Sequence, residues 1–88
     1  MLKEIKGCFA TSLAGHDKGQ MYIITEADDK YVYVCDGKNK LIDTPKKKKR
    51  KHIQLINRKD AEVESKLMSG TLINEDIKRA IKLIKAES

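Results

Sequence analysis

The chain has 88 residues, which suffices for one small domain and excludes a nucleotide-binding α/β enzyme or a barrel enzyme. Hydrophobic residues make up 40% and charged residues 36%, so the chain can fold around a core. Nineteen Lys and Arg against thirteen Asp and Glu leave a formal charge of +6, and an aromatic content of 5% argues against a surface built mainly on stacking.

The first two thirds of the sequence have the pattern of a β protein. Polar turn residues at Asp28–Asp29 and a strong turn signal at Asp36–Gly37 separate short apolar stretches that are rich in β-formers. These stretches predict strands at residues 5–11, 20–25, 30–35, 40–42 and 52–56. Several short strands at such close spacing predict a small all-β barrel or sandwich.

Helical patterns follow Asn57. Asn57 can cap a short helix over Ala61–Ser69, which Gly70 ends, and Asn74 can cap a second helix. The second helix has one apolar stripe at helical spacing, formed by Ile73, Ile77, Ala80, Ile81 and Ile84. We expect this stripe to pack on the barrel; the alternative is a helix that binds a partner protein. The division predicted is a barrel domain at residues 1–57 and a packed helical extension at residues 58–88.

The net charge is concentrated in one segment. The charge of six consecutive cations equals the whole net charge, because the other thirteen cations balance the thirteen acids. The six are Lys46, Lys47, Lys48, Lys49, Arg50 and Lys51. Pro45 precedes this run and the predicted strand at 52–56 follows it, so both ends are tethered to the folded domain. A field concentrated in this way predicts a polyanion partner. A solvated loop or a nuclear-import signal are the alternatives.

A turn rich in glycine and polar residues joins the first two predicted strands. Ser12–Gln20 contains two glycines but lacks the Gly-Lys-Ser/Thr ending of a phosphate-binding P-loop. Its Ser-x-x-Gly-x-Asp-Lys-Gly pattern, between the apolar strands Gly7–Thr11 and Met21–Ile24, resembles a KOW motif.

The resemblance covers roughly residues 3–57. Tyr31–Lys38, followed by Pro45, the lysine run and His52, looks like the small bacterial KOW-domain RNA-binding proteins. These proteins are similar to archaeal and eukaryotic large-subunit ribosomal proteins. The resemblance implies a mainly β fold, an SH3-like barrel of about five strands followed by one or two helices. It also implies ribosomal RNA as the partner, a structural glycine at Gly15 or Gly19, and an exposed loop cation at Lys18.

The predicted site is a set of residues that can contact phosphate. Cations and backbone N–H groups position a nucleic acid without specifying its sequence. The candidates are Gly15, His16, Lys18, Gly19, Lys38, Lys40, Lys46, Lys47, Lys48, Lys49, Arg50, Lys51 and His52. Each of the two histidines can instead be solvated or satisfied locally.

The strand at 30–35 alternates tyrosine and valine. Val32 and Val34 are expected in the core, because successive side chains of a strand point to opposite faces. Tyr31 and Tyr33 are then expected to pack beneath the helices, with stacking on bases as the alternative.

Other chemistry finds little support in the sequence. Cys8 and Cys35 are expected as buried thiols of a cytoplasmic protein rather than as a disulfide. With His16 and His52 they lack the close pairs of a zinc site, so no metal or other cofactor is expected. We expect no enzymatic activity and no small-molecule substrate. We also expect no membrane partner, since no apolar run approaches roughly 18 residues. The rival function is a protein-interaction module of the translation or transcription machinery, using the barrel or the second helix.

Overall fold

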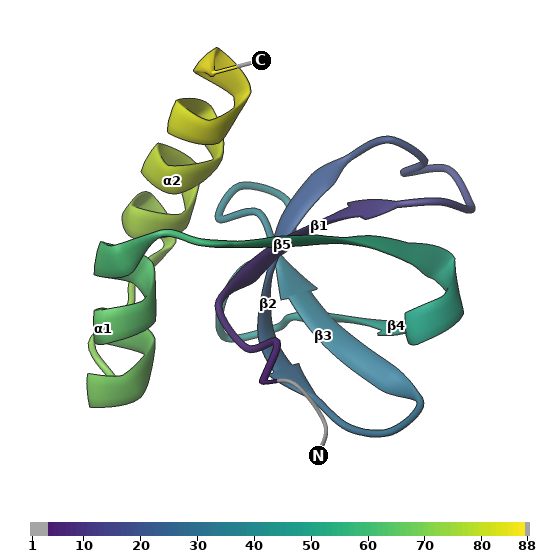
Figure 1. The fold of residues 1–88 in the computed structure, drawn as a ribbon, viewed down its shortest axis with the longest axis horizontal. Helices are drawn as coiled ribbons and strands as arrows, with labels where there is room; N and C mark the ends of the chain where they lie inside the picture. Colours follow the sequence, from purple (N-terminus) through teal and green to yellow (C-terminus); the bar gives the residue numbers. More distant parts are fainter. Residues whose placement is uncertain (1–3, 88) are drawn as a thin grey trace.

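A computed structural model describes residues 4–87 as one antiparallel sheet with two C-terminal helices (Figure 1). The sheet order is β4-β3-β2-β1-β5. The strands are β1 (Cys8–Ser12), β2 (Met21–Ala27), β3 (Tyr31–Cys35), β4 (Lys46–Lys49) and β5 (Ile53–Lys59). A 3₁₀ turn, η1 (Arg50–His52), joins β4 to β5, and α1 (Ala61–Ser69) and α2 (Asn74–Ala86) follow. The predicted small, mainly β fold with C-terminal helices is confirmed; residues 1–3 and 88 of the predicted domains lie outside the described part.

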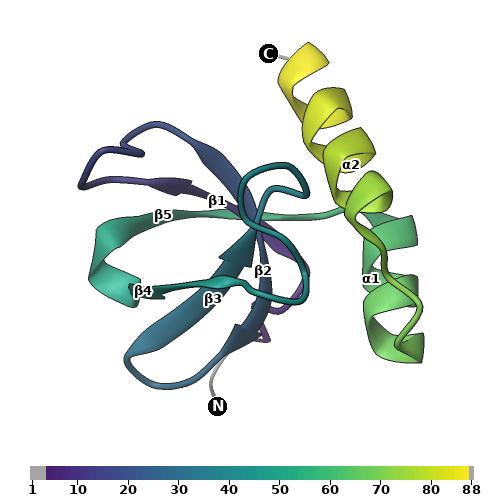
Figure 2. The ribbon, with the colours of Figure 1, turned by 180° about the vertical axis from the view of Figure 1, so that it is seen from behind.

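Successive side chains of each strand point to opposite faces of the curved sheet, and the apolar ones form two clusters, one on each face. The inner cluster is Ile5, Cys8, Ala10, Tyr22, Ile24, Val32, Val34 and Ile53. The outer cluster joins the sheet to the helices and is Phe9, Ile23, Cys35, Val63, Ile77, Ala80 and Ile81. Both views of the ribbon show α1 and α2 together on one side of the sheet (Figures 1 and 2). The predicted core valines and the docking of the α2 stripe are therefore confirmed.

The two cysteines lie in different clusters, Cys8 in the inner one and Cys35 in the outer one. Both are buried free thiols, so they do not form the disulfide that was the alternative.

The helix bounds match the prediction for α1, but both predicted caps are wrong. Asn57 lies within β5, and Asp60 caps α1 by accepting a hydrogen bond from the N–H of Val63 at 3.0 Å. Gly70 ends α1 in the left-handed conformation, as predicted. Asn74 is the first residue of α2, and its amide oxygen accepts from the N–H of Ile42 at 2.9 Å. Asn74 therefore joins α2 to the segment between β3 and β4.

The α2 stripe begins one turn later than predicted, because Ile73 is 52% exposed while Ile77 is fully buried. No helix in residues 4–87 combines the length and the apolar character that crossing a membrane requires.

The fourth strand is not where the apolar pattern placed it. Residues 40–42 lie in an irregular segment, and β4 is built from Lys46–Lys49, the first four residues of the cationic run. Lysine is a poor β-former, so sequence propensity favoured the apolar residues. β4 is an edge strand, however, and lysine is common at sheet edges because its charge discourages pairing with other chains.

Candidate nucleic-acid interface

The pairing of β4 with β3 divides the cationic run between two faces. In this antiparallel register Val34 lies opposite Lys46 and Val32 opposite Lys48, whereas Tyr31 lies opposite Lys49. Lys46 and Lys48 therefore share the face of the buried valines, while Lys47 and Lys49 are exposed on the other face. The segment expected as one uniform binding loop is thus a strand with alternating roles.

Both inward lysines form ion pairs with one carboxylate, that of Asp17 in the β1–β2 turn at residues 12–20. Its oxygens lie 3.1 Å from Lys48 Nζ and 3.4 Å from Lys46 Nζ. They also accept hydrogen bonds from the Tyr22 hydroxyl at 2.6 Å and the Ser12 hydroxyl at 2.9 Å. Burial acts to raise the pKa of Asp17, but these bonds from Tyr22, Lys48 and Ser12 hold that pKa well below its usual range. Asp17 thus offsets one unit of the positive charge of the cationic run and holds Lys46 and Lys48 against the β1–β2 turn.

The β1–β2 turn exposes the predicted residues to solvent, but fewer of its backbone N–H groups are free to bind a ligand than expected. Gly15, His16, Lys18 and Gly19 are all exposed. The N–H of Gly19 donates to the carbonyl of Ser12 at 2.8 Å, so it cannot also donate to a phosphate. Gly19 instead supplies the backbone conformation of the turn, with φ at 88°. Lys18 forms no salt bridge with any residue in 4–87 and is free to contact an anion.

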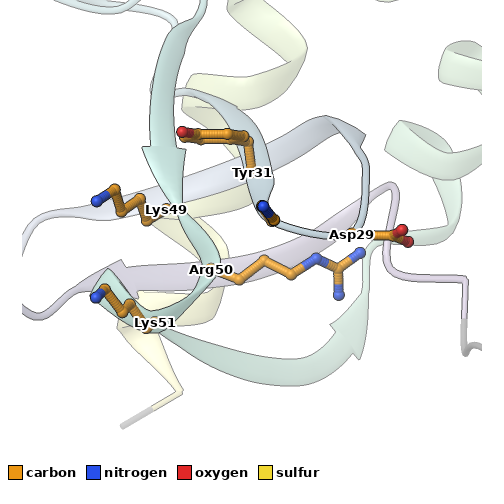
Figure 3. A pocket seen from close by; sticks show the side chains of 6 residues that line it. Asp29, Tyr31, Lys49, Arg50 and Lys51 are labelled. Atoms are coloured by element: carbon orange, nitrogen blue, oxygen red, sulfur yellow. The ribbon is translucent and has the colours of Figure 1, made fainter.

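A pocket of about 440 Å³ lies where the β2–β3 turn meets the end of β4 and the 3₁₀ turn. Four cations, one acid and one aromatic ring line it: Lys30, Lys49, Arg50, Lys51, Asp29 and Tyr31. Figure 3 shows Lys49 and Lys51 extending to one side, while Arg50 extends the other way toward the turn that carries Asp29. We call this the β4 pocket.

Backbone hydrogen bonds fix the geometry of the β4 pocket. The N–H of Arg50 donates to the carbonyl of Lys30 at 2.8 Å, and Arg50 Nε donates to the carbonyl of Asp28 at 2.5 Å. The Asp28 carboxylate accepts the N–H groups of Lys30 and Tyr31 at 2.9 and 2.8 Å, which shapes the turn. The cations of the pocket are thus held on a defined backbone rather than on a loose loop, which reduces the ordering cost of binding.

The tyrosines do not pack beneath the helices, and that prediction is wrong. Tyr31 and Tyr33 lie half-buried on the outer face and belong to neither buried cluster. The Lys47 ammonium lies 4.2 Å from the centroid of the Tyr31 ring, a cation–π contact. The helices reach the sheet at Cys35, at the opposite end of β3. Tyr31 consequently remains beside the cations of the β4 pocket.

The remaining candidates occupy different places. His52 ends the 3₁₀ turn half-buried, and its carbonyl accepts the N–H of Leu13 at 2.8 Å, which connects the β1–β2 turn to the start of β5. Lys38 is exposed and Lys40 half-buried in a turn next to α2. The Asp36 carboxylate shapes this turn by accepting the N–H groups of both residues, at 2.9 and 2.8 Å.

Cations of the helical part form salt bridges within the described residues, whereas those of the β4 pocket do not. In the helical part Lys66 pairs with Asp76 at 2.9 Å and Arg79 with Asp60 at 3.2 Å. Among the described residues, none of the four pocket cations, Lys30, Lys49, Arg50 and Lys51, has a carboxylate oxygen within 4.0 Å. The β4 pocket therefore keeps its charge, which favours the encounter with a polyanion.

Sequence reasoning missed Lys30 and Asp29 as members of this site. Lys30 precedes β3 directly, so an antiparallel partner to β3 at Lys46–Lys49 brings Lys30 beside Arg50. Assigning the lysine run to a strand would have revealed this neighbour. Across residues 4–87, no three His, Cys, Asp or Glu side chains gather in a way that could hold a metal ion.

Comparisons with known proteins add no identification. The chain matches no protein-family model and no curated protein sequence.

Proposed function

We propose that this protein binds RNA through the phosphate backbone, with the β4 pocket as the principal contact. The observation that carries the proposal is the set of four cations in that pocket, none of which forms a salt bridge with a carboxylate among the described residues. Cations at phosphates release condensed counterions, so such binding is strong at low salt and weakens as salt rises. Lys47 and Lys18 extend the contact beyond the pocket.

The choice of RNA over DNA rests on the KOW-like turn, since phosphate contacts do not distinguish the two. The resemblance of Ser12–Gly19 to that motif supports RNA, and ribosomal RNA of the large subunit in particular. In this proposal the protein acts in the cytoplasm on or near the ribosome. Tyr31, at the rim of the pocket, offers an aromatic edge to an unstacked base.

The first test measures the affinity for a fluorescein-labelled decauridylate by anisotropy at several salt concentrations. For a single strand the slope of log affinity against log salt is about −0.7 per neutralised phosphate. Lys49→Gln together with Lys51→Gln removes two exposed cations of the pocket. We expect the slope to become shallower by about 1.4 units, as two lost contacts require.

The matched control removes two cations elsewhere. Lys6 and Lys59 line a different hollow together and pair with Glu26 and Glu64, so Lys6→Gln with Lys59→Gln lowers the net charge equally. An equal change of slope in this control would mean that only net charge matters and would contradict the assignment of the pocket. Failure of the unaltered chain to bind RNA at low salt would contradict the function itself.

Association with the ribosome has its own test, which is sedimentation of cell lysate through sucrose gradients at low and high salt. Co-sedimentation with large ribosomal particles that salt reverses is the expected result. Sedimentation at the top of the gradient in both conditions would contradict stable ribosome association and leave a free RNA as the partner.

The rival function, a protein-interaction module that uses the barrel or α2, receives less support from α2 than the apolar stripe suggested. Ile77 and Ile81 of the α2 stripe are buried against the sheet, and Ile84 is partly buried there. The face that was the alternative docking surface for a partner is already covered by the barrel.

A further inference from the structure

A second cationic hollow lies at the other end of β3, beside α2. It measures about 470 Å³, and its charged lining is Asp36, Lys38, Lys78, Lys82 and Lys85. Four cations therefore face one carboxylate, the same ratio as in the β4 pocket. We call it the α2 pocket.

Two lysines of the α2 pocket, Lys38 and Lys82, are available to a ligand. Lys38 and Lys82 are exposed, and neither forms a salt bridge with a residue in the described range. Lys78 approaches the exposed Glu75 only at 3.9 Å, a surface contact that contributes little. The Asp36 carboxylate is engaged with backbone N–H groups and with Gln20 Nε2 at 3.3 Å, so it shapes the turn beneath Lys38.

One continuous segment connects the two pockets. Lys38 lines the α2 pocket, and Lys49 and Lys51 line the β4 pocket thirteen or fewer residues later. Figure 2 shows this segment leaving the side of α2 and continuing into β4. Lys40 and the outward Lys47 lie along it, so cations are present between the pockets as well as within them.

The spacing of the pockets suits a chain of phosphates. Tyr31 lines one pocket and Asp36 the other, and they are five residues apart at the two ends of β3. At about 3.4 Å per strand residue this is roughly 17 Å. Each strand of B-form DNA advances about 3.4 Å per nucleotide along the helix axis, and at that spacing about five nucleotides cover the same distance.

We propose that the α2 pocket is a second phosphate-binding subsite and that one single-stranded RNA segment of about five or more nucleotides occupies both pockets. The inference rests on the proposed RNA binding and adds a minimum ligand length and a role for α2. Joining two weak subsites through one ligand raises the affinity well beyond that of either subsite, because the second contact becomes intramolecular.

The experiment is a series of fluorescein-labelled oligouridylates of 2 to 12 nucleotides, bound to four proteins at two or more salt concentrations. The proteins are the unaltered chain, the β4-pocket variant Lys49→Gln/Lys51→Gln, the α2-pocket variant Lys38→Gln/Lys82→Gln, and the control Lys6→Gln/Lys59→Gln. The altered cations of both pockets are exposed, and urea unfolding verifies that every variant folds.

With the unaltered chain and the control, we expect affinity to rise at least about tenfold between four and eight nucleotides, as bridging requires. In the α2-pocket variant this rise disappears. The salt slope for the longest oligomer also becomes shallower by about 1.4, while the binding of two- to four-nucleotide oligomers at the β4 pocket persists.

The two proposals fail in different ways. If RNA binding depends on Lys49 and Lys51 but the α2-pocket variant behaves like the control at every length, the inference is wrong and the proposed function stands. If the unaltered chain binds none of the oligomers at low salt, both are wrong.

Discussion

Lys48 and Asp17 are 31 residues apart in the chain and form an ion pair of 3.1 Å across the end of the barrel. The side chains are only 9% and 15% exposed, respectively. The pair joins the β1–β2 turn to the edge strand β4, so the two segments that were predicted separately to bind RNA are in contact. It also shows that a lysine within a cationic run can serve the fold rather than the ligand.

Asp17→Asn is expected to destabilise the fold by about 3 kcal/mol at pH 7, because it leaves the enclosed Lys48 without its counter-charge. The folded-state pKa of Asp17 lies below its unfolded value of about 3.9. The stabilisation is therefore complete above about pH 5 and is lost as the pH falls toward the folded pKa. Urea unfolding of both proteins between pH 7 and pH 2 measures this. A stability difference that stays constant down to pH 2 would contradict the assignment.

The same substitution at two adjacent lysines of β4 is expected to affect different properties, the stability at Lys48 and the RNA affinity at Lys49. Lys48→Gln should lower the free energy of unfolding by about 2 kcal/mol, since it breaks an enclosed ion pair. Lys49→Gln should leave the unfolding midpoint unchanged and weaken RNA binding, because Lys49 is exposed in the β4 pocket. Urea unfolding and oligouridylate anisotropy on both variants give the comparison. Equal effects of the two substitutions on stability would show that β4 does not have the alternation described.

Gly37→Ala tests the contact between the Asp36–Lys40 turn and α2. Gly37 has φ at 77°, and an added Cβ would collide with the backbone oxygen of Asn74. We expect a loss of about 3 kcal/mol or more, from backbone strain together with the displacement of α2. Gly19→Ala is the control, because Gly19 has φ at 88° but open space around it, so only the strain of about 1 to 2 kcal/mol applies. Thermal unfolding distinguishes the two.

The docking of α2 can be tested on its apolar stripe. Ile77→Ala should destabilise the protein by about 3 kcal/mol, because Ile77 is fully buried between α2 and the sheet. Ile73 was predicted to belong to the same stripe but is 52% exposed, so Ile73→Ala should cost less than about 1 kcal/mol. Urea unfolding of the two variants provides the measurement. Similar losses would indicate that Ile73 is covered, in contrast to the structure.

The local patterns were sufficient for much of the fold. Strand alternation placed Val32 and Val34 in the core, and Gly70 marked the end of α1, because both depend on interactions within a few residues. The caps were wrong for the same reason. Asn57 and Asn74 have side chains suited to capping, but the extent of β5 and the contact with Ile42 decide their roles.

What the sequence by itself determined is the mainly β class with C-terminal helices, the apolar faces, and the concentration of charge in residues 46–51. The tertiary structure alone decided which of those cations face outward, because strand register depends on pairing with β3 rather than on lysine propensity. It also decided that Asp17 pairs with Lys46 and Lys48, and that Lys30 and Lys82 lie in cationic pockets. Charges far apart in the sequence interact through space, and their positions follow from the curved sheet and the docked helix.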